Sequence, residues 1–226
     1  MSRYVLRSAC AFGIGLAGAF VAAAPAALTI TEVAPQSSLN TPSTINGDWW
    51  ELTNSGPAPI DLAGYKWADT EDEIGGPTPQ PNIFPSVVIA PGESIIIIDE
   101  LSSSEEAWRT NWGAPATLQI LSTDEMLPTP PATDTFSGLG NTNDGVFFYD
   151  PSGATLSSYL YAQNTRGVTF EIATDGTDLG LSVVGENFAV LAANGDIGSP
   201  GVAVPEPTVL SLGMMGAGLL LRRRRG

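Results

Sequence analysis

The chain has 226 residues, a formal net charge of −15 and no histidine. Between Leu28 and Val204 it holds three basic and 23 acidic residues, a net charge of −20, which repels phosphate backbones and argues against nucleic-acid binding. Histidine is absent and Cys10 is the only cysteine, so the chain beyond its N-terminal segment lacks the usual general base, a disulfide framework and a thiolate zinc site.

The first 27 residues are predicted to be a secretory signal peptide. Arg3 and Arg7 precede an apolar run rich in alanine and glycine, and small residues continue to Ala26 and Ala27. Cleavage after Ala26 or Ala27 fits this plan, and it requires signal peptidase and the secretion machinery as partners. The alternative is a membrane anchor that is not cleaved.

Short strands are expected through the middle of the chain. They lie at 28–34, 48–54, 59–69, 82–99, 145–162 and 167–173. In "DWWELTN" (48–54), the alternation places Trp50 and Leu52 on one face of a strand, and Trp49 and Glu51 on the other. Strands this short, separated by turn signals at intervals of about 8–12 residues, are typical of an all-β sandwich.

Two of these segments contain a turn. Residues 82–99 read as two strands around Pro91-Gly92, and the unbroken apolar run Ile95–Ile98 predicts a strand that is buried on both faces. Residues 145–162 read as a hairpin with its turn at 150–153.

One helix is expected, at residues 102–113. Ser102 with Glu105, and Ser103 with Glu106, have the spacing of a capping box at a helix start. Gly113 is a suitable residue to end the helix.

Two features are weak candidates for ligand binding. An exposed Trp49 would offer an aromatic platform to a sugar ring, whereas the alternative makes Trp50 core and lets Trp49 cover the opposite face. An acidic loop offers oxygen ligands for calcium, but its spacing is not that of an EF-hand and a solvated loop is the favoured interpretation. The calcium candidates are Asp69, Glu71, Asp72 and Glu73.

The sequence contains no set of catalytic residues that can be recognised, so the chain is predicted not to be an enzyme and to need no cofactor. Glu105 and Glu106 are neighbours on a short helix and cannot face each other across a cleft, as glycosidase chemistry requires. Neither a phosphate-binding glycine loop nor a Gly-x-Ser-x-Gly elbow is present.

The C-terminal segment, residues 204–226, combines a short apolar run with a basic end. The 14 residues Thr208–Leu221 would span about 21 Å as a helix, which is short for a hydrocarbon core of about 30 Å. The arginines that follow would stay on the cytoplasmic side as a topogenic stop. These are Arg222, Arg223, Arg224 and Arg225. A transient transmembrane helix fits this pattern, and a permanent tail anchor is the alternative.

The same segment resembles the PEP-CTERM sorting signal of Gram-negative bacteria. The matching parts, in order, are the motif Pro205-Glu206-Pro207, the apolar run and the arginine cluster. This resemblance implies export across the inner membrane, transient membrane insertion, and removal of the tail by an exosortase at the cell surface. It also implies hosts that make exopolysaccharide and biofilm.

The middle of the chain resembles the lamin-tail domain, an immunoglobulin-like β-sandwich. The segments that carry the resemblance are "ITEV", "DWWELTN", "IDLAGYKWAD", "VVIAPGESIIII", "NTNDGVFFYDPSGATLSSYLYA" and "NGDIGSPG", which together cover about 28–201. Trp50 and Trp67 depart from it, because the family usually has smaller side chains there. The expected organisation is a signal helix (1–27), the sandwich with one short helix (28–203) and the sorting segment (204–226).

These patterns predict a secreted structural or adhesive module of the cell envelope or extracellular matrix, with other surface proteins as possible partners. A second hypothesis is a surface module that binds exopolysaccharide or another carbohydrate, with or without calcium. A third is an accessory domain that has lost an enzymatic neighbour. It rests on the occurrence of lamin-tail domains beside extracellular nucleases.

Overall fold

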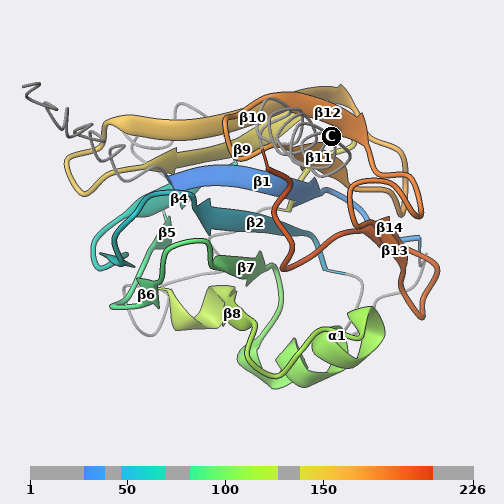
Figure 1. Cartoon of the computed structure of the whole chain (residues 1–226), viewed down its shortest axis with the longest axis horizontal. Helices are drawn as coiled ribbons and strands as arrows, with labels where there is room; N and C mark the ends of the chain where they lie inside the picture. The colour runs from blue at the N-terminus through green and yellow to red at the C-terminus, as the bar shows by residue number, and fades with distance from the viewer. Residues whose placement is uncertain (1–27, 39–46, 70–81, 127–137, 206–226) are drawn as a thin grey trace, which may run out of the picture.

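The computed structural model describes residues 28–38, 47–69, 82–126 and 138–205. Within these ranges, most of the regular structure is β-strand (Figure 1). The strands are β1 (Leu28–Ala34), β2 (Trp49–Asn54), β3 (Ile60–Asp61), β4 (Lys66–Ala68), β5 (Asn82–Ile83), β6 (Val88–Ile89), β7 (Ser94–Ile98), β8 (Gln119–Ser122), β9 (Thr142–Tyr149), β10 (Thr155–Gln163), β11 (Phe170–Ile172), β12 (Asp178–Leu181), β13 (Val190–Leu191) and β14 (Ile197–Gly198). The helices are η2 (Ser102–Ser104), α1 (Glu105–Trp112) and η3 (Thr123–Glu125).

Two larger sheets form a sandwich. One has six strands in the order β12-β11-β1-β2-β7-β8, and the other has four in the order β10-β9-β4-β5. Their strand pairs are antiparallel except β7 with β8, which run parallel because η2 and α1 carry the chain back between them. Figure 1 shows β9 and β10 on one side of β1 and β2, and α1 on the other. The all-β sandwich with one short helix is therefore confirmed.

The main core lies between the two sheets. Trp50 and Leu52 of β2 contact Phe148 of β9 and Trp67 of β4 within one cluster of fully buried side chains. The Trp50 ring centroid lies 5.4 Å from that of Trp67 and 6.3 Å from those of Phe84 and Phe148. The two large residues at positions 50 and 67 are thus accommodated at the centre of the sandwich.

A second, smaller core lies on the outer face of the six-stranded sheet, under α1. Trp49, Ile96 and Ile98 of the sheet contact Trp108 and Trp112 of the helix. The alternation predicted for residues 48–54 is confirmed, because Trp49 and Trp50 enter different cores. The burial of Ile95–Ile98 on both faces follows from the same arrangement, and each of these isoleucines is at most 1% exposed.

The predicted helix is present, but it does not begin as expected. Gly113 ends α1 in the left-handed region at φ 63°, as predicted. No capping bond forms from a serine side chain at its start. Ser102 instead donates its backbone N–H and its hydroxyl to the Asp124 carboxylate, 22 residues away. A tertiary contact has replaced the local cap.

The predicted hairpin and the predicted turn at Pro91-Gly92 are also found. β9 and β10 pair across a turn in which Gly153 donates to the carbonyl of Asp150. Gly92 has φ +76°, which suits the tight turn between β6 and β7. β6 and β7 do not pair with each other. Instead, β6 pairs with β3, and β7 pairs with β2.

The signal peptide and most of the C-terminal segment lie outside the described residues. Within the ranges that the structure describes, no helix is long and apolar enough to cross a membrane.

Candidate functional site

Trp49, the candidate sugar platform, is buried. Its side chain is 3% exposed, and its ring meets Trp108 and Trp112 edge-on at centroid distances of 5.5 and 5.4 Å. A ring enclosed in this way has no open face on which a sugar can stack. The structure therefore corrects the platform hypothesis, and the alternative, in which Trp49 covers the opposite face of its strand, holds.

The calcium candidates are mostly beyond the described residues. Asp69 is buried at the end of β4, whereas Glu71, Asp72 and Glu73 fall in the range 70–81, which is not described. Among the described residues, no group of three or more acidic, histidine or cysteine side chains is arranged to hold a metal ion.

The acidic pair on α1 is not arranged for catalysis. Glu105 accepts a hydrogen bond from the Ser122 hydroxyl at 2.9 Å, and desolvation raises the pKa of its carboxyl. Glu106 is exposed and lies 3.7 Å from the Arg109 guanidinium. The two side chains therefore have different neighbours and do not face each other across a cleft.

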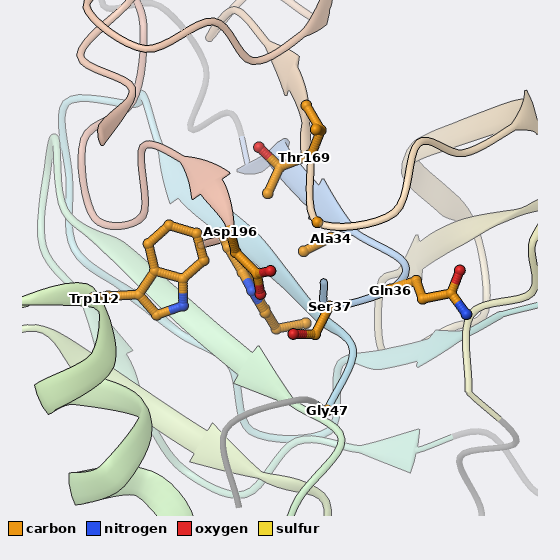
Figure 2. Close-up of a pocket in the computed structure, with 10 residues that line it drawn as sticks. Ala34, Gln36, Ser37, Gly47, Trp112, Thr169 and Asp196 are labelled. Atoms are coloured by element: carbon orange, nitrogen blue, oxygen red, sulfur yellow. The ribbon is translucent and has the colours of Figure 1, made fainter. Parts of the chain in front are cut away.

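A small pocket opens where β1 ends, beside α1 and the turn before β14. About 220 Å³ of empty space lies between its lining residues, and this volume includes open solvent, so the pocket is shallow. In Figure 2, Trp112 reaches in from α1 toward Asp196 and Ser37. The Asp196 carboxylate accepts bonds from the Ser38 N–H at 2.6 Å and the Asn194 amide at 2.8 Å. It thus serves to fix the chain after β1 to the 194–196 turn.

Three buried carboxylates lie side by side on the outer face of the six-stranded sheet. Glu32 of β1 is paired in register with Glu171 of β11 on one side and with Glu51 of β2 on the other. Their exposed fractions are 1%, 2% and 1%. A bulge in β1 after Ile30 turns Glu32 onto this face, where Thr31 also donates to Glu51. We call Glu171, Glu32 and Glu51 the carboxylate row.

Hydroxyl groups and backbone N–H groups donate hydrogen bonds to the carboxylates of Glu51 and Glu32. Glu51 accepts from the Thr31 hydroxyl at 2.6 Å and from the Gly201 N–H. Glu32 accepts from the Thr169 hydroxyl at 2.5 Å and from the Ser199 N–H at 2.7 Å. Neutral donors alone therefore face these two carboxyl groups.

The electrostatics of Glu32 and Glu51 favour bound protons. Desolvation, followed by repulsion from Glu51, raises the pKa of Glu32 well above its ordinary value. Desolvation also raises the pKa of Glu51, although its hydrogen bonds from Thr31 and Gly201 oppose this. Basic side chains are scarce in the described residues, and each is occupied elsewhere. Arg109 donates to the Pro115 and Leu118 carbonyls, Arg166 to the Ser37 carbonyl, and Lys66 lies on the other sheet.

The C-terminal strap, which we define as residues 197–204, covers Glu32 and Glu51 of the row. It runs from β14 across β1 and β2 and returns to β11, where Val204 forms a parallel bridge with Ala173. A Cβ atom at Gly198 would lie 2.5 Å from a carboxylate oxygen of Glu32, so only glycine permits this close approach.

A group of exposed apolar side chains extends from the end of β12 to β13, the strand that pairs with β14 at the start of the strap. Phe188 is 60% exposed and has φ 69°, a backbone region that bulky residues rarely occupy. The turn that presents it is anchored through Asn187, whose amide donates to Glu171 at 2.9 Å. We call this group the apolar tip. It comprises Leu181, Val183, Val184, Phe188, Val190 and Leu191.

Of the predicted sorting residues, only Pro205 is described. It is exposed and follows directly after Val204, the last residue of the strap. Glu206, Pro207 and Arg222–Arg225 lie outside the described residues.

Sequence reasoning missed both the carboxylate row and the apolar tip. Alternation placed Glu51 on the face opposite the core, but it did not show that a segment 150 residues later covers that face. The available signal for the apolar tip was the high content of apolar residues in "LSVVGENFAVL" (181–191).

Comparison with known protein families matches residues 21–163 to the Lamin Tail Domain family, which is more than half of the chain. The match includes Glu32 and Glu51 but ends before β11, so Glu171 and the strap lie beyond it. The resemblance expected as far as residue 201 is thus supported only to residue 163. A comparison with curated proteins gave no match. This chain therefore belongs to the Lamin Tail Domain family.

Proposed function

We propose that the chain is an exported, non-enzymatic β-sandwich module with a removable C-terminal sorting tag. The mature domain would act as a structural or adhesive component of the cell envelope or the extracellular matrix. The family supports a non-enzymatic β-sandwich, because the lamin tail domain is an immunoglobulin-like structural domain and not typically enzymatic.

The position of the motif carries the sorting proposal. Val204 is 7% exposed, and its carbonyl accepts a hydrogen bond from the Thr174 N–H at 2.9 Å. The next residue, Pro205, is exposed and begins the Pro-Glu-Pro motif. The motif therefore starts directly after Val204, which is still hydrogen-bonded to the sandwich, and this suits a signal that a processing enzyme must read next to a folded cargo.

The apolar tip supports an adhesive role. Exposed apolar groups of this kind commonly mark surfaces that bind other proteins. Because the domain carries a net charge of −20 between Leu28 and Val204, polyanionic partners are disfavoured. Other surface proteins, or neutral exopolysaccharide, fit this surface better. Carbohydrate binding through Trp49 is no longer favoured, because that ring is enclosed.

Replacing Pro205, Glu206 and Pro207 with alanines is expected to leave the precursor uncleaved in the membrane fraction of its own host. The reason is that an exosortase would lose its recognition element while the domain still folds. The readout is the mass of the protein in each cell fraction. A matched control replaces Pro57 and Pro59, another exposed Pro-x-Pro step, and should be processed normally. Normal processing of the triple variant would show that the motif is not a sorting signal.

A further inference from the structure

The carboxylate row and the strap depend on each other. The strap donates the N–H groups of Ser199 and Gly201 to Glu32 and Glu51, and it keeps water away from both. The strap has few other attachments, namely the β14 pairing and the bonds of Ile197 and Val204 to residues 167–174. The contacts to the row hold the middle of the strap, from Ser199 to Gly201.

The row tolerates few negative charges. An ionised carboxylate in a buried site is strongly unfavourable unless a positive charge compensates it. The titratable groups that act on Glu32 are Glu51 and Glu171, and the strap brings only serine, glycine and apolar side chains to this surface. Ionisation of the whole row would therefore place three like charges on adjacent strands without compensation.

Glu171 supplies a separate observation. One of its carboxylate oxygens accepts from Asn187, whereas the other is buried without a hydrogen-bond partner. A buried polar atom left in this way destabilises the folded arrangement of the row.

We propose that the C-terminal strap is a proton-dependent latch. It is closed over Glu32 and Glu51 while these two carboxyl groups retain protons, and it opens when they ionise and take up water. Opening frees the eight residues 197–204. Fully extended, they would add about 26 Å to the segment that joins the sorting motif to the sandwich. This consequence rests on the proposed sorting function, whereas the latch itself does not.

The test is amide hydrogen exchange of the full chain between pH 6 and 10, expressed as protection factors. Above the transition, protection at Ser199 and Gly201 should fall up to tenfold per pH unit for each proton released, because opening is linked to deprotonation. Protection at Leu52 and Ile96, in the centre of the sheet, should stay higher than at the strap throughout, because those amides exchange only when the whole domain unfolds. Equal protection factors at the strap and at the sheet centre over the whole pH range would mean that the strap opens only by global unfolding, and would overturn the latch.

Variants of the row provide the second arm. Glu32→Gln and Glu51→Gln each remove one carboxyl group whose pKa is raised, so the fall in strap protection should shift to higher pH or become shallower. Glu105→Gln is the matched control, since Glu105 also has a raised pKa but lies outside the row, and its strap should behave as in the wild type. An unchanged pH profile in both row variants would contradict the proposal.

The two proposals fail in different ways. If the strap opens with rising pH but the C-terminal tail is never processed, the latch proposal stands and the sorting proposal fails. If the tail is processed normally but the protection of the strap does not change with pH, only the latch proposal fails.

Discussion

Replacing Trp50 with alanine is expected to lower the free energy of unfolding by about 3–5 kcal/mol, the usual cost of removing a large aromatic side chain from a core. Trp50 is fully buried and touches Trp67, Phe84 and Phe148, so its removal leaves a cavity between the two sheets. Domains of this kind are stable by only about 5–15 kcal/mol, and the loss is a large part of that. Urea denaturation followed by fluorescence measures it.

Leu160→Ala is the matched control for Trp50→Ala. Leu160 lies on β10 and is 64% exposed, so its truncation should change stability by no more than about 0.5 kcal/mol. If the two variants were destabilised equally, the main core would not lie between the sheets as described.

The free energy of unfolding is expected to fall as the pH rises from 5 to 9. Desolvation, reinforced by repulsion from Asp99 and Asp144 and opposed by the Leu139 N–H, raises the pKa of Asp48 to about 8. The folded state therefore holds a proton that the unfolded chain releases near pH 3.8. The resulting stability is complete below that value and is lost as the pH rises through about 8. The raised pKa values of Glu32 and Glu51 act in the same direction.

The size of the pH effect follows from linkage. Each proton that the folded state alone retains contributes a slope of about 1.4 kcal/mol per pH unit. Asp48→Asn should remove one such contribution and flatten the curve of unfolding free energy against pH. Asp150→Asn is the control, because Asp150 is fully exposed and its pKa is lowered by the Ser152 hydroxyl, so it does not titrate in this range. Stability that stayed level or rose between pH 5 and 9 would contradict the charge state assigned to these groups.

Much of the fold could be predicted from local patterns. The alternation of Trp49-Trp50-Glu51-Leu52 sufficed to place the two tryptophans on opposite faces, since side chains in a strand alternate strictly. The apolar run Ile95–Ile98 indicated a strand covered on both sides, and Gly113 marked the end of α1. In each case the cause lies within a few residues of the feature.

What could not be predicted depends on segments that are distant in the sequence. β8 is short and mixed in character, and it becomes a strand by pairing in parallel with β7 across the α1 crossover. Trp49 looked available for a ligand because the helix that covers it follows more than 50 residues later. The four-residue spacing of Trp108 and Trp112 was the available signal, since it places both rings on one face of a helix that needs a sheet to cover it.

The most direct test of the central claim is the intact mass of the protein recovered from membrane, surface and medium fractions of its own host. The sorting proposal predicts a surface or medium species that lacks both the N-terminal segment and the residues beyond Pro205–Pro207. A species that has lost only its N-terminal segment and remains in the membrane fraction would make Thr208–Leu221 a permanent anchor and contradict the proposal.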